Sequence, residues 1–145
     1  MKPAAADAGP RAGRARPVQA LACGLVLLLG LASRRYPGFL PGLLGKYPGD
    51  VFWAMMVFFG WGALWLRAGP RSMAALALAT CFAVEILKLY PTPWITGLRH
   101  TTLGPLVLGR VFSVGNLVAY AVGVCLALGV EVLWLRRDQR TNRPA

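Results

Sequence analysis

The sequence predicts an all-α integral membrane protein, a bundle of four transmembrane helices with both termini in the cytoplasm. Three observations support this prediction: the composition, the grouping of apolar residues into blocks, and the placement of positive charge. Of the 145 residues, 57% are hydrophobic and 14% are charged, and the mean hydropathy is +0.54. A soluble domain carries about 25% charged residues. The length allows one domain, so the blocks are expected to form a single bundle.

Four apolar blocks define the expected spans inside a membrane domain at residues 17–135. A helix needs roughly 20 apolar residues to cross the hydrocarbon core of a bilayer, and about 17 is the lower limit. Proline and glycine between the blocks mark helix ends. The expected spans cover residues 17–33, 51–66, 72–90 and 111–135, between a basic tail at residues 1–16 and a basic C-terminal tail at residues 136–145, both expected to be disordered.

The first span also has features of a cleaved signal peptide. A basic segment precedes it, its core is hydrophobic, and it ends in GLAS before Arg34. However, Leu31 is a poor small residue at the minus-three position, and the apolar run is long for a signal peptide. We therefore expect the first span to be retained.

The positive charges predict the orientation. With four spans, the N-terminus, the second loop and the C-terminus share one side and hold twice as many Lys and Arg residues as the first and third loops. Cytoplasmic loops carry this excess, so both termini are expected in the cytoplasm. The net charge of +11 flanks the spans, which favours contact with anionic lipid headgroups. We expect membrane lipids as partners and no nucleic acid.

Two charges interrupt the third span. Glu85 and Lys88 lie three residues apart in VEILKLY, so they share a helix face and can pair. A charge at the centre of an inserted helix costs roughly 2.5 to 3.5 kcal/mol, which makes a functional site one interpretation. The alternative is structural: Lys88 extends outward to the headgroups, and Glu85 neutralises it or accepts a proton.

Other polar residues have local explanations. Asp50 follows Pro48 and Gly49 at the start of the second span, where a helix N-cap is expected. Ser113 has the same position before the fourth span. Glu131 is expected to be solvated at the inner membrane surface.

The histidine and the cysteines do not form a metal or cofactor motif. His100 is the only histidine, and it has no carboxylate or cysteine partner at a ligand spacing. The three cysteines fall within predicted spans and are expected to be buried thiols, namely Cys23, Cys81 and Cys125. No metal and no cofactor are expected.

The segments VEILKLY and PWITGLRHTTLGPLVLGRVFSVGNLVAYAVGV resemble the second half of an uncharacterised family of short bacterial membrane proteins, domain of unknown function 2809. This family is itself distantly similar to VanZ-like proteins. The segment SRRYPGFLPGLLGKYPGDVFWAMMVFFG resembles the first half, so the resemblance covers roughly Leu31 to Val124. It implies a location in the bacterial inner (plasma) membrane. VanZ-like proteins are associated with glycopeptide resistance in some bacteria, which implies a role at the cell envelope.

The resemblance also implies candidate site residues. It maps the helix glutamate of the family onto Glu85, its loop arginine and histidine onto Arg99 and His100, and its Arg-x-Phe-Ser motif onto the segment that begins at Arg110. Two positions depart from the pattern: Lys88 stands where a glutamine is expected, and Asn116 stands where an aspartate is expected. A mechanism that needs a Glu and Asp pair is therefore not favoured.

Three functions remain open. The first is binding of an anionic group, such as a lipid headgroup or the phosphate of a lipid-linked glycan, at the extracytoplasmic face. The planar fork of arginine suits such a ligand, and Glu85 would orient one guanidinium. The candidate binding residues are Arg34, Arg35, Glu85, Lys88, Arg99, His100, Arg110 and Asn116.

The other two functions use Glu85 in proton chemistry. An intramembrane enzyme would use Glu85 as a general acid or base, with His100 or Arg99 as its partner. A small proton-coupled transporter would use the Glu85 and Lys88 pair. Glycines within the spans also permit close helix contact, so a homo-oligomer is a further expectation.

Overall fold

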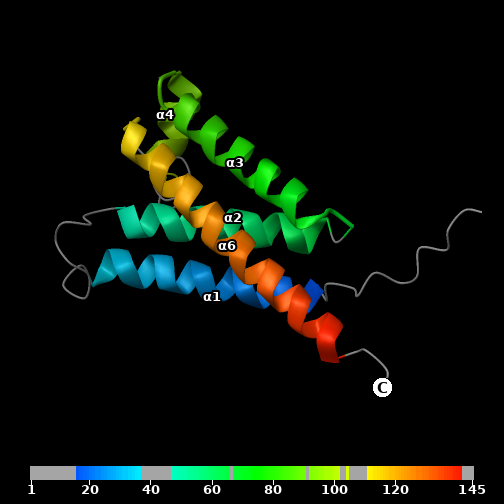
Figure 1. Cartoon of the computed structure of the whole chain (residues 1–145). Coiled ribbons are helices and arrows are strands. Elements are labelled where there is room, and N and C mark those ends of the chain that lie inside the picture. Colours follow the sequence, from blue (N-terminus) through cyan, green and yellow to red (C-terminus); the bar gives the residue numbers. More distant parts are fainter. Residues whose placement is uncertain are drawn as a thin grey trace, which may run out of the picture.

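The computed structural model describes residues 16–36, 47–65, 67–90, 92–101, 104 and 111–141. Over these residues the chain is helical and contains no strand, which confirms the predicted all-α class. The five helices in this part of the chain are shown in Figure 1: α1 (Arg16–Arg35), α2 (Tyr47–Leu64), α3 (Pro70–Leu87), α4 (Pro93–Arg99) and α6 (Val114–Thr141).

Helix α2 occupies the centre of the bundle. It packs against α1, α3 and α6, and α3 also packs against α6. Small residues allow the closest approach: a Cβ atom at Gly123 of α6 would lie 2.4 Å from the carbonyl oxygen of Val51 in α2. The core between the helices contains Ala54, Phe58, Phe59, Met73, Ala77, Cys81, Tyr120, Val124 and Ala127.

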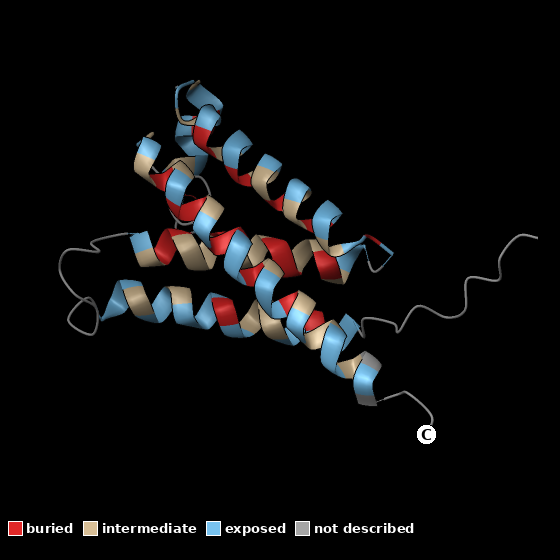
Figure 2. Cartoon of the chain, in the orientation of Figure 1, coloured by how far each residue is buried: buried red, intermediate tan, exposed pale blue. Residues whose placement is uncertain are grey.

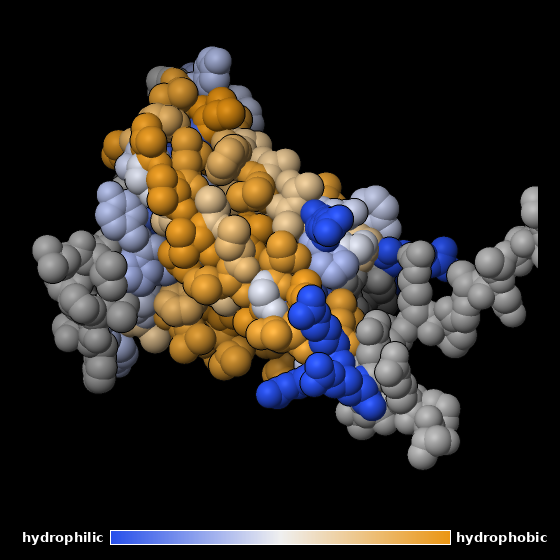
Figure 3. All heavy atoms as spheres, viewed as in Figure 1, coloured by the Kyte–Doolittle hydropathy of each residue, from blue (hydrophilic) through white to orange (hydrophobic). Residues whose placement is uncertain are grey.

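The outer faces of the bundle are apolar. On α1, Leu21, Leu25 and Leu28 recur at helical spacing and are 58–75% exposed. Figure 2 shows the buried residues as stripes on the facing sides of the helices, and Figure 3 shows the apolar surface outside them. A soluble monomer rarely exposes contiguous apolar patches of more than a few hundred Å², whereas such faces suit contact with lipid chains.

Three helices are long and apolar enough to cross a membrane, namely α1, α3 and the Val114–Asp138 part of α6. The chain is therefore a membrane protein by the length and composition of its helices. Helix α2 does not reach the same mean hydropathy, because its first turn contains Pro48 and Asp50. The helices thus provide three candidate membrane spans, which correspond to three of the four expected spans.

The helix boundaries differ from the apolar blocks. Helix α2 begins at Tyr47 rather than residue 51, because proline is tolerated in a first turn and an acidic residue there is favourable. Helix α6 begins at Val114 rather than residue 111 and continues to Thr141, so residues 136–141 are helical instead of forming a tail. Arg16 begins α1, and the rest of the two predicted tails lies outside the described residues.

Helix α4 was not anticipated in the sequence. It covers Pro93–Arg99, with Pro93 in its first turn and Thr92 before it. Proline at this position is compatible with a helix start because its missing N–H is not needed there. The short helix positions Arg99 and His100 beside the end of α3.

Candidate functional site

The candidate site lies where the last turn of α3 meets the start of α6. Glu85 follows Ala77 and Cys81 at intervals of four residues on the buried face of α3, and all three side chains are fully buried. This spacing directs the Glu85 carboxylate toward α6. The segment that precedes α6 then supplies the contacts.

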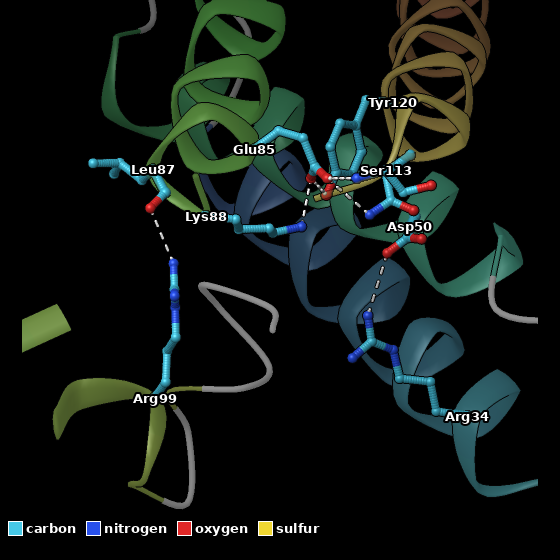
Figure 4. Close-up of polar contacts among 9 residues, drawn as sticks. Arg34, Asp50, Glu85, Leu87, Lys88, Arg99, Ser113 and Tyr120 are labelled. Atoms are coloured by element: carbon cyan, nitrogen blue, oxygen red, sulfur yellow. Dashed lines mark hydrogen bonds and ion pairs between the residues drawn. The ribbon is translucent and has the colours of Figure 1, made fainter. Parts of the chain in front are cut away.

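Each oxygen of the Glu85 carboxylate accepts two hydrogen bonds. Oε1 accepts from the backbone N–H of Ser113 at 2.8 Å and from Asn116 Nδ2 at 3.1 Å. Oε2 accepts from the hydroxyl of Tyr120 at 2.9 Å and from Lys88 Nζ, as Figure 4 shows. Because every partner donates, the arrangement suits an ionised carboxylate, which accepts hydrogen bonds and donates none.

Lys88 forms the ion pair that its spacing from Glu85 predicted. Its side chain is 4% exposed, so it does not extend outward to the headgroups, and that part of the structural interpretation was wrong. Lys88 is also the C-cap residue of α3, where a positive charge is favourable. The pair therefore satisfies two buried charges and the end of the helix together.

Helix α6 contributes the remaining donors through its first two turns. Ser113 directly precedes the helix, and Asn116 and Tyr120 lie four residues apart on one face. The carboxylate of Glu85 thus sits at the positive end of the α6 dipole. Asn116 is 3% exposed, and its Oδ1 has no hydrogen-bond partner among the described residues.

A second ion pair joins α1 to α2. Arg34 Nη2 lies 3.6 Å from Asp50 Oδ1, and the Arg34 side chain crosses Gly49, where a Cβ atom would lie 2.8 Å from Arg34 Nε. Because α2 begins at Tyr47, Asp50 lies inside its first turn, and the predicted N-cap role was wrong.

Glu85 was expected to orient a guanidinium, but among the described residues its cationic partner is a lysine. The cation beside Glu85 is Lys88, and the carboxylate beside a guanidinium is Asp50. Arg99 instead donates from Nη2 to the carbonyl oxygen of Leu87 at 3.0 Å, which satisfies a carbonyl at the end of α3. Its Nε is buried and has no hydrogen-bond partner in the part of the chain that the structure describes.

The other candidate residues are outside this cluster. His100 is an exposed C-cap residue of α4. Arg35 is exposed, and its guanidinium carbon lies 5.5 Å from the centroid of the Tyr36 ring. Arg110 lies outside the described residues. The structure thus brings together Glu85, Lys88 and Asn116 from the candidate set, and it adds the Ser113 backbone and Tyr120.

The burial of the Glu131 carboxylate was also missed. Glu131 is 3% exposed and accepts a hydrogen bond from Gln19 Nε2 at 2.8 Å, so the expectation that Glu131 is solvated was wrong. This contact links α1 to α6. Gln19 fits here because Gly62 of α2 has no side chain: a Cβ atom there would lie 2.7 Å from Gln19 Oε1.

The cysteines are free, and only two of them follow the expectation of burial. Cys81 is fully buried and Cys23 is partly buried, whereas Cys125 is exposed on the outer face of α6. Among the described residues, no three His, Cys, Asp or Glu side chains come together in an arrangement that could hold a metal ion.

Comparison with known families gives the class of the protein. Residues 39–124 match the family model described as a protein of unknown function (DUF2809). The match covers more than half of the chain, and the chain belongs to this family. It includes α2, α3, α4 and the first part of α6, and therefore both elements that build the Glu85 site, the end of α3 and the start of α6. No solved structure matches the chain.

Proposed function

We propose that this protein is a four-span protein of the bacterial inner membrane that binds an anionic group at the extracytoplasmic end of its bundle. The ligand is a lipid headgroup or the phosphate of a lipid-linked glycan. Arginine side chains bind it, and the Glu85 cluster fixes the ends of α3 and α6 around it. The resemblance to VanZ-like proteins supports a role at the cell envelope.

The dimensions of α2 support a fourth span. Its 18 residues correspond to about 27 Å at 1.5 Å per residue, close to the hydrocarbon thickness of about 30 Å. In its polar first turn, Gly49 lies against Arg34 of α1, and Tyr47 lies against Gly115 of α6. The start of α1 and the end of α6 lie toward the same end of the bundle (Figure 1), in agreement with an even number of spans and both termini in the cytoplasm.

The observation that carries the proposed binding function is the distribution of donors. Glu85 is paired with Lys88, so its carboxylate does not use a guanidinium of Arg34 or Arg99. Arg99 has a buried Nε that has no partner among the described residues, and a buried donor without an acceptor costs about 1 to 3 kcal/mol. A phosphate or carboxylate that binds Arg99 would remove this cost, and a guanidinium can bind such a group through two parallel hydrogen bonds.

The two alternatives use Glu85 in a way that its contacts do not favour. A general base or a proton carrier needs a carboxylate that a substrate or water can reach, and the Glu85 side chain is fully buried with four donors around it. An enzyme or a transporter would have to break this set of hydrogen bonds in each cycle. Anion binding needs no such rearrangement.

Native mass spectrometry tests the proposed binding. The protein is released from nanodiscs that contain equal amounts of phosphatidylglycerol and phosphatidylcholine, and the retained lipids are identified. We expect preferential retention of phosphatidylglycerol. Arg99→Gln should weaken it roughly tenfold, because a charge-assisted hydrogen bond contributes about 1.5 kcal/mol or more. Arg99→Lys should give an intermediate loss, since the charge remains and the fork does not.

The matched control for Arg99 is Arg136→Gln. Arg136 is exposed near the other end of α6, so its loss removes the same charge from the opposite membrane surface. Retention of phosphatidylglycerol should be unchanged in this variant. Equal retention by the wild type and Arg99→Gln would contradict the proposed role of Arg99, and no preference for phosphatidylglycerol in the wild type would contradict anion binding altogether.

A further inference from the structure

A small groove lies between α1 and α2, at the end of the bundle where Arg34 pairs with Asp50. It encloses a cavity of about 30 Å³. Its walls are apolar, with Leu27 and Leu31 from α1 and Phe52 from α2, and Arg34 and Gly49 lie at one end. The groove therefore combines a hydrophobic wall with one cationic side chain.

The sequence creates this groove by omitting side chains. Gly30 faces Phe52, and a Cβ atom on Gly30 would lie 3.2 Å from the Cβ atom of Phe52. At the end of the groove, Gly49 provides the space in which the Arg34 side chain crosses α2. Leu27 and Leu31 are 39% and 40% exposed, so the wall from α1 is open to the surroundings of the bundle.

Arg34 is available for a ligand. Its side chain is 42% exposed, and its contact with Asp50 joins one terminal nitrogen to one oxygen at 3.6 Å, longer than a hydrogen bond. A guanidinium carries five N–H donors in a fixed fork, so most of its donors are not used by Asp50. Arg34 lies in the last turn of α1, where basic residues meet the headgroups of a bilayer.

We propose that the groove binds one acyl chain of an anionic phospholipid, whose phosphate binds Arg34. The inference rests on the proposed anion binding. It narrows the ligand to a phospholipid that is bound through both its phosphate and one acyl chain. From Leu27 to Arg34 the groove extends about 10 Å along the helix, so the chain lies along the hydrocarbon depth while the phosphate stays at the surface.

The size and the charge of the groove favour a lipid over a second protein chain. A helix has a diameter of about 10 Å or more with its side chains, and a cavity of about 30 Å³ does not admit one. The cavity has about the volume of one water molecule, so a flexible methylene chain would lie along the exposed wall of Leu27 and Leu31 and place part of its length in the cavity. The cation at the end of the groove then selects a negatively charged headgroup.

Photolabelling in nanodiscs tests this inference. The probe is phosphatidylglycerol with a diazirine in one acyl chain, and phosphatidylcholine with the same labelled chain is the comparison. After illumination, proteolysis and mass spectrometry map the labelled residues. We expect the anionic probe to label the groove residues of α1 and α2, with severalfold less labelling by the neutral probe and displacement by unlabelled phosphatidylglycerol.

Two variants test separately the groove that binds the acyl chain and the positive charge of Arg34. Leu31→Trp places a large ring in the groove and should reduce its labelling severalfold, whereas Leu28→Trp, at a 64% exposed position of α1 that does not line the groove, should not. Arg34→Gln should weaken the anionic probe roughly tenfold and the phosphatidylcholine probe less, because its choline offsets the charge of its phosphate. Thermal melting checks that each variant is folded. Displacement of the probe from the wild type by unlabelled phosphatidylglycerol tests the site without any variant.

The outcomes that would contradict this inference differ in which claim they exclude. Labelling spread evenly over the exposed faces of α1 and α6, with phosphatidylglycerol still retained in native mass spectrometry, would overturn the groove and leave the proposed anion binding. Equal groove labelling by the two probes would overturn the role of Arg34. Absence of any preference for the anionic lipid in both experiments would overturn the proposed function together with this inference.

Discussion

At the scale of single residues, the buried pair of Glu85 and Lys88 fixes the local structure more than it adds net stability. Taking two charges out of water costs several kcal/mol for each ion, and their attraction recovers this cost only when other hydrogen bonds complete the site. Glu85 has those bonds from the Ser113 N–H, Asn116 and Tyr120. Removal of one charge should therefore lower the free energy of unfolding more than removal of both.

The first prediction follows from this asymmetry. Lys88→Met should lower the free energy of unfolding by about 3 to 5 kcal/mol, because it leaves a buried carboxylate without its cation. The double variant Glu85→Gln and Lys88→Met should recover a large part of this loss. The measurement is thermal or denaturant unfolding in detergent, evaluated as a double-mutant cycle.

The single variants Lys88→Met and Glu85→Gln distinguish a buried ion pair from a surface ion pair. Exposed pairs contribute about 0 to 1 kcal/mol. If Lys88→Met unfolds with the stability of the wild type, the pair is solvated and Glu85 is not the buried centre of the site. A loss in the double variant equal to the sum of the losses in the two single variants would mean that the two residues do not interact energetically.

At the scale of helices, α6 packs closely against α2 at Gly123. Gly123 faces α2 so closely that a Cβ atom would lie 2.4 Å from the Val51 carbonyl oxygen and 2.9 Å from the Ala54 Cβ atom. Neither neighbour is the flexible end of a side chain. Glycine is therefore required here for helix packing, as is common between helices in membranes.

The second prediction uses this contact. Gly123→Ala should lower the free energy of unfolding by about 1 to 3 kcal/mol, because an extra methyl group in a packed contact forces the helices apart. Gly129→Ala, in the same helix, has no atom within 4 Å of the new Cβ and should be neutral or slightly stabilising, since alanine favours a helix by about 1 kcal/mol over glycine. Equal effects of the two changes on the melting temperature would contradict the tight packing of α6 on α2.

The sequence contained the elements but not all of their contacts. Hydrophobic blocks located the four long helices, and helical spacing predicted that Glu85 and Lys88 pair. Block boundaries follow where apolar residues begin, so the polar first turn of α2, which includes Asp50, was missed although it is helical. The apolar pattern marks membrane depth, whereas a helix boundary is set by the backbone and its caps.

The partners supplied by other helices had no local signal. Tyr120 contacts Glu85 because α6 crosses the end of α3, and Gln19 reaches Glu131 because Gly62 leaves space between them. Both contacts depend on crossing positions that a single sequence does not specify. The spacing of Asn116 and Tyr120 on one face of an apolar helix was the one available hint for this part of the site.

At the scale of the whole molecule, the number of spans decides which residues share a side of the membrane. With four spans, the end of α1, the start of α2, the end of α3 and the start of α6 all lie on one side of the membrane. Arg34 and the Glu85 cluster then face the same compartment. With α2 outside the set of spans, the end of α1 and the end of α3 would lie on opposite sides, and Arg34 and the Glu85 cluster would face different compartments.

The last prediction concerns this topology. In a variant without the native cysteines, single cysteines are placed at Tyr36, Gly69 and Arg140, which lie at the ends of α1, α3 and α6 and are exposed. A membrane-impermeant maleimide should label position 36 in intact spheroplasts, and it should label positions 69 and 140 only after permeabilisation. This result requires α2 to cross the membrane, since position 69 follows it. Labelling of positions 69 and 140 from outside would instead fit the three spans α1, α3 and α6, and the Glu85 cluster would then face the cytoplasm.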